Sequence, residues 1–250
     1  MFNSTPFTIS YGDDPESLDP VLDILRDCGA FLEVEIIATG EDLYRREIKE
    51  GILPESYISL NRTKLLLKAF TRTPKDSEYI GVMEGLCQKF GVHTKLQYLV
   101  GENSAGVGII TESELKRFEP QHIAEVCKAS LRLGGRSFAY AVDDLRLMIE
   151  KELEEYPSLA ANFINTENFA EKIADFDVVF VNAEQEAKLH KAIKPKFGCN
   201  IFLGNGFAFF EADDDYNKNN KGLLLAAAMV LKYSGQNDAA WAVYNLVVSP

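Results

Sequence analysis

Short apolar segments alternate with segments of helical periodicity along the whole chain, and this alternation limits the folds open to it. Apolar runs of strand length include Phe7–Ser10, Leu65–Leu67, Leu96–Val100, Ser137–Val142, Phe176–Val181 and Phe207–Glu211. Between such runs, apolar residues recur every three or four positions, as in Val21–Cys28 and Val82–Phe90. The pattern predicts an α/β fold with a largely parallel sheet. Asp19 and Pro20 predict the start of the first helix.

The net charge limits the classes of partner that the chain can bind. With 38 acidic against 26 basic residues, the net charge is −12, so we expect no nucleic acid partner. The longest apolar helical segment, Leu223–Leu231, is too short to span a membrane, and we expect an interior or interface helix there. The four cysteines lie far apart, which favours reduced, buried thiols. The N-terminus has the pattern of neither a secretory nor a mitochondrial presequence, although one removed before Met1 stays possible.

The sequence contains few candidate catalytic, metal-binding or phosphate-binding motifs. The three histidines, His93, His122 and His190, lack metal-ligand spacing, and His122 is expected to be a solvated or capping residue. The glycine-rich stretch Gly101–Gly108 favours a flexible loop over a phosphate cradle. Asp213–Asp215 lacks the glycine and glutamate of a calcium-binding loop, so we expect a solvated polar turn between a strand and a helix.

Several short motifs, taken in order, resemble the isocitrate/isopropylmalate dehydrogenase family, and most of all its NAD-dependent isocitrate dehydrogenases. The resemblance is carried by Gly12-Asp13, Lys68–Pro74, Leu86–Phe90, Leu96-Gln97, Glu102–Ser104, Glu154–Pro157, Phe176–Val178, Asn200-Ile201, Ala208–Glu211 and Leu223–Leu231. Each motif is weak alone, but their common order covers nearly the whole chain. The resemblance implies a doubly wound, mostly parallel sheet, with a large α/β domain (residues 1–98 and 199–250) and an inserted smaller α/β domain (residues 99–198).

The family's substrate and metal positions are occupied here by residues of other types. The resemblance puts the family's serine at Gly81, its asparagine at Met83, and its substrate arginines at Cys87, Gln97 and Gly101. Its metal-binding aspartates fall on Asn165 or Thr166 and near Glu186–His190, and its nucleotide-binding loop falls on Asp213–Lys221. The proton-transferring lysine has no counterpart in Ala139–Asp144, and the family's tyrosine is absent from Glu102–Ile109. Because a multiply charged anion needs cationic donors, these departures predict no catalytic, cofactor-binding or metal-binding residues and no cofactor.

The sequence therefore predicts a pseudoenzyme, a shortened member of the family that acts as a structural or accessory subunit of a larger protein complex. An alternative is a regulatory subunit of a hetero-oligomeric NAD-dependent isocitrate dehydrogenase. Either role implies other protein subunits as partners, in a homo- or hetero-oligomer. An enzyme with an altered substrate would need a new catalytic set, which the sequence does not reveal. Resemblance alone suggests a mitochondrial location; otherwise the chain is expected to be cytoplasmic.

Overall fold

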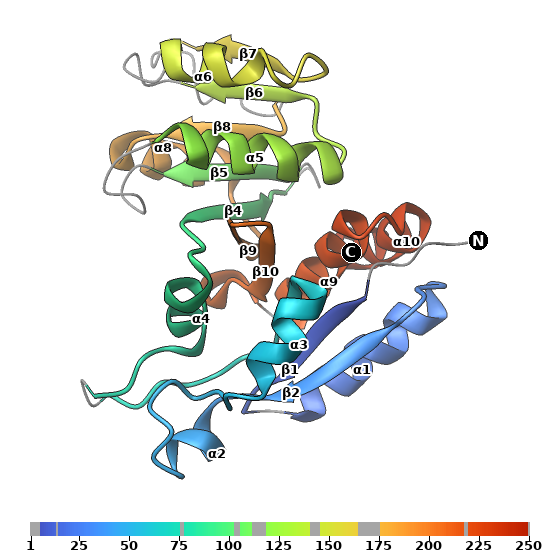
Figure 1. Ribbon diagram of the computed structural model, residues 1–250. Coiled ribbons are helices and arrows are strands. Elements are labelled where there is room, and N and C mark those ends of the chain that lie inside the picture. Colours follow the sequence, from blue (N-terminus) through green and yellow to red (C-terminus); the bar gives the residue numbers. More distant parts are fainter. Residues whose placement is uncertain are drawn as a thin grey trace.

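A ten-stranded mixed sheet runs through the computed structural model (Figure 1), which describes residues 6–13, 15–75, 78–102, 106–111, 119–140, 146–164, 176–217 and 220–249. The strand order is β2-β1-β3-β10-β9-β4-β5-β8-β6-β7. Neighbouring strands are parallel except around β9 and β4, where three pairings are antiparallel. In chain order the strands are β1 (Phe7–Tyr11), β2 (Val34–Ala38), β3 (Leu65–Lys68), β4 (Thr94–Val100), β5 (Gly106–Thr111), β6 (Ser137–Tyr140), β7 (Ala160–Phe163), β8 (Val178–Val181), β9 (Phe197–Gly204) and β10 (Phe207–Ala212).

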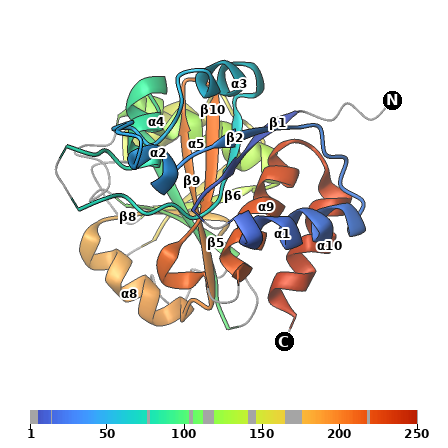
Figure 2. The ribbon, with the colours of Figure 1, turned by 90° about the horizontal axis from the view of Figure 1, so that it is seen from below.

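Helices cover both faces of the sheet. One face carries α1 (Pro15–Asp27), α5 (Pro120–Arg132), α6 (Arg146–Leu153), α9 (Lys221–Tyr233) and α10 (Asn237–Val248). The other face carries α3 (Ser56–Thr63), α4 (Val82–Phe90) and α8 (Ala183–Ile193), and the short α2 (Glu41–Tyr44) lies near them. Figure 2 shows α1, α9 and α10 packed side by side. The arrangement confirms the α/β class and the doubly wound, mostly parallel sheet.

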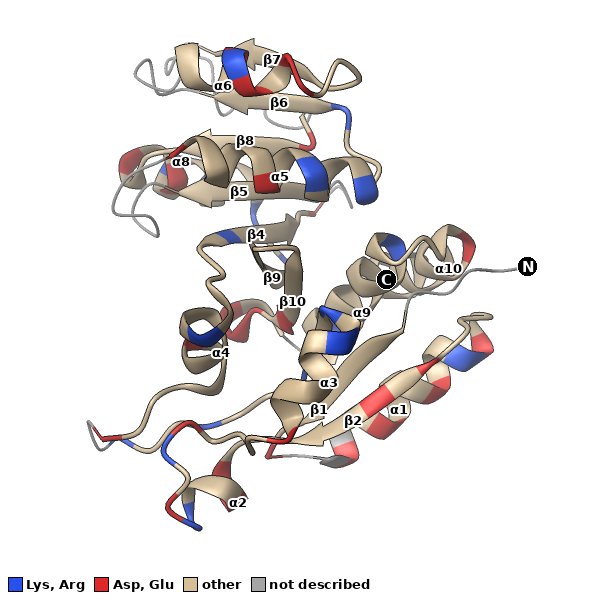
Figure 3. Ribbon diagram, in the orientation of Figure 1, with Lys and Arg blue, Asp and Glu red and all other residues tan. Residues whose placement is uncertain are grey.

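Local sequence explains the main elements. In α1 the side chains of Leu18, Val21 and Leu25 are buried, whereas acidic positions follow the outer face of the helix (Figure 3), as amphipathic spacing requires. The helix begins at Pro15, so the start expected at Asp19 and Pro20 is wrong, and Pro20 lies inside the helix. Helix α9 is buried along nearly its whole length, as its uniformly apolar sequence predicts. No helix in the described ranges is both long and apolar enough to cross a membrane.

The glycine-rich segment gives a different element from the one expected. Residues 103–105 lie outside the described part, but Gly106 starts the strand β5. A Cβ atom on Gly106 would approach the Tyr98 hydroxyl to 2.1 Å, and one on Gly108 would lie 3.1 Å from a Leu96 methyl carbon. These glycines therefore let β5 pair with β4 beneath two large side chains. The division into two domains stays a prediction, although β1 and β10 do lie in one sheet.

Candidate functional site

Four polar residues form a line across the sheet, on the face covered by α3, α4 and α8. Lys68 of β3 is the register partner of Glu211 in β10, Glu211 is the partner of Asn200 in β9, and Asn200 is the partner of Gln97 in β4. Register partners in neighbouring strands point to the same face. We call Lys68, Glu211, Asn200 and Gln97 the polar row.

One end of the polar row is an ion pair. Lys68 Nζ lies 2.9 Å from Glu211 Oε2, with 7% and 19% of the two side chains exposed, and Lys68 Nζ also donates to the carbonyl oxygen of Ala69 at 3.3 Å. Lys68, Glu211 and Asp214 line a small cavity of about 30 Å3, enough for one small polar group. Partial burial, followed by the charge of Glu211, raises the pKa of Asp214. The positive charge of Lys68 is therefore already balanced by nearby carboxylates.

The other end of the polar row belongs to a hydrogen-bonded network. Gln97 Nε2 donates to Asp213 Oδ2 at 2.7 Å, and Gln97 Oε1 lies 3.1 Å from His190 Nε2. Since an amide oxygen only accepts, Nε2 of His190 is the donor, which leaves Nδ1 of the neutral ring to accept from the Tyr216 hydroxyl at 3.3 Å. The network joins β4, α8 and the 3-10 turn at Asp214–Tyr216. It holds an imidazole, the group best suited to move protons near neutral pH.

Asn200 lies between these two ends. Its Oδ1 atom is buried and accepts no hydrogen bond, and the residue as a whole is 9% exposed. An unsatisfied buried acceptor costs about 1–3 kcal/mol. The polar row thus contains an acceptor that would be satisfied by an O–H or N–H donor from a ligand.

Helix α4 supplies no cation to the polar row. Gly81 is the N-cap of α4 and Met83 is 8% exposed within an apolar cluster. Burial, followed by the charge of Glu211, raises the pKa of the Cys87 thiol to about 12. This thiol stays protonated at neutral pH, so it is neither an anion-binding group nor an activated nucleophile.

The expected turn at Asp213–Asp215 follows β10, but it is not fully solvated. Asp213 is 6% exposed and accepts hydrogen bonds from Gln97 and from the backbone N–H of Asp215. The sequence could not reveal this burial, because its cause is the contact with Gln97, 116 residues away. His122 behaves as a capping residue, since its Nδ1 accepts from the backbone N–H of Glu119 at 3.0 Å.

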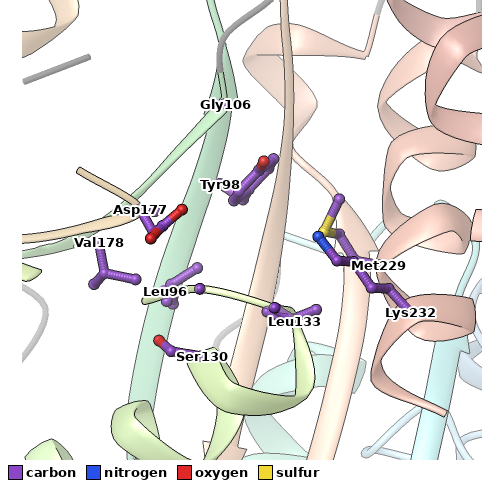
Figure 4. Close-up of a pocket in the computed structure, with 12 residues that line it drawn as sticks. Leu96, Tyr98, Gly106, Ser130, Leu133, Asp177, Val178, Met229 and Lys232 are labelled. Carbon is purple, nitrogen blue, oxygen red and sulfur yellow. The ribbon is translucent and has the colours of Figure 1, made fainter. Parts of the chain in front are cut away.

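A second cavity lies on the opposite face of β4, between α5 and α9 (Figure 4). It has a volume of about 60 Å3 and its walls include Tyr98, Ser130, Asp177 and Lys232. The Ser130 hydroxyl is buried without a partner, while Asp177 accepts from the backbone N–H groups of residues 136 and 137. Burial lowers the pKa of Lys232. The sheet separates this cavity from the polar row, so the two do not form one site.

Known proteins resemble the chain in sequence and in fold. No family model matches the sequence. Two curated relatives, the NADP isocitrate dehydrogenases of Rickettsia conorii and Rickettsia felis, are each 27% identical to the chain over 98% of its length. The chain is therefore similar in sequence to isocitrate dehydrogenases, at a low identity that extends over nearly its whole length. It spans 63% of the length of these relatives.

Solved structures of the family share the fold. The isocitrate dehydrogenase from Methylococcus capsulatus matches 94% of the chain with a TM-score of 0.66 at 16% identity, and the chain covers 87% of that structure. A β-decarboxylating dehydrogenase from Thermococcus kodakarensis matches 97% of the chain with a TM-score of 0.70 at 17% identity, and 89% of that structure is covered.

These comparisons correct the expectation that the chain is a pseudoenzyme. That expectation is wrong, because the curated relatives are named as isocitrate dehydrogenases and the structural neighbours include a β-decarboxylating dehydrogenase, which points to an enzyme. The error came from treating each replaced family residue as a loss. Sequence spacing could not show that His190 and Asp213 bond to Gln97, or that Tyr216 bonds to His190. The comparisons also give no support to a mitochondrial location, since the curated relatives are bacterial.

The family's divalent metal does not fit the residues that the structure describes. Within the described ranges no group of three His, Cys, Asp or Glu side chains could hold a metal ion, and Asn165 and Thr166 lie outside those ranges. The phosphates of a dinucleotide also fit poorly at residues 213–215, where three consecutive carboxylates would repel them. We therefore place neither group at these residues.

Proposed function

We propose that the chain is an isocitrate dehydrogenase-like enzyme subunit whose polar row binds a small hydroxylated substrate with fewer carboxylate groups than isocitrate. The observation that carries the proposal is the pairing of Gln97 with Asp213 at 2.7 Å. The family resemblance puts a substrate-binding arginine at Gln97. An amide held by a carboxylate offers neither the charge nor the forked donors that a tricarboxylate needs.

The charges around the polar row support the same substrate class. Glu211, Asp213 and Asp214 are carboxylates, and Lys68 is the cation that the described residues place among them. At 4 Å, two like charges near a protein surface repel by about 4 kcal/mol at an effective dielectric constant of 20. Each carboxylate added to a substrate therefore weakens its binding, whereas a hydroxyl group can donate to Asn200 Oδ1.

The residues of this chain would handle protons and orientation. In this proposal His190, held between Gln97 and Tyr216, would accept the proton of the substrate hydroxyl at Nδ1 when the Tyr216 hydroxyl moves aside, and added NAD or NADP would take the hydride as the oxidant. Asn200 orients the substrate hydroxyl. The buried Lys68–Glu211 pair fixes the carboxyl ends of β3 and β10, and so keeps the polar row in place.

A purified sample tests the proposal against a series of 2-hydroxy acids: isocitrate, malate and lactate. Each is assayed for turnover with NAD and with NADP, and the variants His190→Phe and Gln97→Ala follow. We expect turnover to favour malate or lactate over isocitrate, and to fall at least about 100-fold in His190→Phe, the range of a lost proton-transfer group. Turnover highest with isocitrate would overturn the proposed substrate class.

We also propose that the enzyme works with other protein subunits, either copies of itself or a longer member of the family. Two large apolar side chains near the outer end of the sheet support this, since Leu147 of α6 is 80% exposed and Phe163 of β7 is 43% exposed. Mass measurement in solution tests it. We expect an oligomer that dissociates in Leu147→Glu but not in the matched variant Lys151→Glu on the same helix. A chain that is monomeric at all concentrations and co-purifies with no other protein would refute the proposal.

A further inference from the structure

A further cavity lies on the other side of α4, away from the polar row. It has a volume of about 440 Å3, within the range of small-molecule sites. Gly85 and Lys89 line it, and since they are four positions apart they share one face of the helix, while Cys87 lies about 200° around the axis from Gly85. We call this cavity the α4 pocket.

The walls of the α4 pocket are fixed before any ligand arrives. Its apolar lining includes Ile48, Ile52 and Ile80. The backbone N–H of Ile80 donates to the carbonyl oxygen of Lys49 at 3.0 Å, and the Tyr44 hydroxyl donates to the carbonyl oxygen of Ile80 at 2.7 Å. These bonds tie together the two chain segments on either side of the opening, so binding would order little new structure.

Gly85 creates the space at the base of the α4 pocket. A Cβ atom on Gly85 would lie 3.8 Å from the Ile80 side chain and 3.9 Å from that of Glu50. These are ordinary contact distances, so alanine fits there, whereas a large side chain would occupy the pocket itself. Glycine in a helix interior is less stable than alanine, and here it leaves the space open.

Two opposite charges flank the α4 pocket at Tyr57. Lys89 Nζ lies 5.3 Å from the centre of the Tyr57 ring. Glu50 and Tyr57 both line the pocket, and burial, followed by the charge of Glu50, raises the pKa of Tyr57. In the described part of the chain neither Glu50 nor Lys89 takes part in an ion pair, although the adjacent Lys49 pairs with Glu78. Both charges are thus available to a ligand.

We propose that the α4 pocket binds an apolar α-amino acid, with its ammonium group toward Glu50, its carboxylate toward Lys89 and its side chain against the three isoleucines. A zwitterion satisfies both free charges at once, and an aliphatic side chain matches the apolar wall. The pocket is separate from the polar row, so this binding does not depend on the proposed enzyme function.

Isothermal titration of the full chain with leucine tests the proposal, with leucinamide and N-acetylleucine as probes that each lack one charge. We expect leucine to bind, and each single-charge probe to bind at least fivefold more weakly. Equal affinity for all three probes would overturn the zwitterion assignment, and the absence of any leucine binding would overturn the site. Neither result bears on turnover at the polar row.

Variants locate the binding. Glu50→Gln and Lys89→Met should each weaken leucine at least fivefold, while the matched control Glu55→Gln, an exposed change outside the pocket, should leave it unchanged. Gly85→Phe should abolish binding by filling the pocket, and Gly85→Ala should retain it. Because Glu50 and Lys89 are exposed, their variants should fold even if Gly85→Phe does not, and wild-type affinity in both of them would refute the proposal.

Discussion

Replacing Lys68 by methionine tests whether the polar row rests on its ion pair. Methionine keeps most of the apolar stem of lysine but removes the ammonium group that lies 2.9 Å from Glu211 Oε2. The Glu211 carboxylate, 19% exposed, would then remain in a poorly solvated position with Asp214 as its charged neighbour. The charge left behind, rather than lost packing, dominates the expected effect.

The magnitude follows from burial. Removing one partner of a buried pair costs about 3–5 kcal/mol, and the residual exposure of Glu211 puts Lys68→Met near the lower end, at about 3 kcal/mol. Glu211→Gln leaves the lysine unpaired but able to donate to the carbonyl oxygen of Ala69, so it should cost less, about 2 kcal/mol. The double variant has no uncompensated charge and should be more stable than Lys68→Met alone.

Urea unfolding of the two single variants and the double variant, monitored by circular dichroism, gives the coupling energy. The exposed pair Lys188–Glu184, at 2.7 Å with 56% and 78% of the side chains exposed, is the matched control, and Lys188→Met should change the free energy of unfolding little, because solvent screens this pair. A cost for Lys68→Met as small as that of the control would show that solvent screens the Lys68–Glu211 pair, and the reasoning would fail.

Three further predictions concern single positions. Gln97→Arg adds the cation that the resemblance puts there, and calorimetry should find isocitrate bound about threefold more tightly or better; unchanged affinity would contradict the role given to Gln97. Asp214→Asn should raise Tm slightly at neutral pH. The gain in the free energy of unfolding should be well under about 1 kcal/mol, because the side chain is exposed on its outer side. Because the pKa of Asp214 is raised, protonation of this carboxyl stabilises the folded state. That stabilisation is fully present below the unfolded-state pKa of about 3.9 and is lost as the pH rises. The gain from Asp214→Asn should therefore vanish in acid, and a gain that persists at low pH would contradict this sign. Gly106→Ala should cost about 1–3 kcal/mol in thermal unfolding, since the new Cβ atom would meet the Tyr98 hydroxyl at 2.1 Å, and Tyr98→Phe should restore part of it; a neutral Gly106→Ala would show that Tyr98 moves freely.

The apolar pattern of the sequence predicted the elements that are buried along nearly their whole length. The buried helix α9 and the strand β8, which is buried at every position, follow from apolar sequence alone. Strand β5 did not, because its glycines are favoured only once Leu96 and Tyr98 lie over them. Strand β7, with mostly exposed residues, carries little apolar signal.

The candidate site was harder to predict for a related reason. The family resemblance located Gln97, but its partners Asp213 and His190 are 116 and 93 residues away in the sequence. No local pattern connects them. Likewise, the orphaned Asn200 Oδ1 follows from the register of three strands and not from its own sequence neighbours.

In the proposed function, the polar row binds a substrate with fewer negative charges than isocitrate. Calorimetric titration of the purified chain with lactate, malate and isocitrate at low ionic strength tests it most directly, because binding is measured without cofactor or turnover. We expect the affinity to fall as the number of carboxylates rises from one to three, and added salt to reduce the difference in affinity. Isocitrate binding most tightly of the three, and losing affinity in Gln97→Ala, would contradict it.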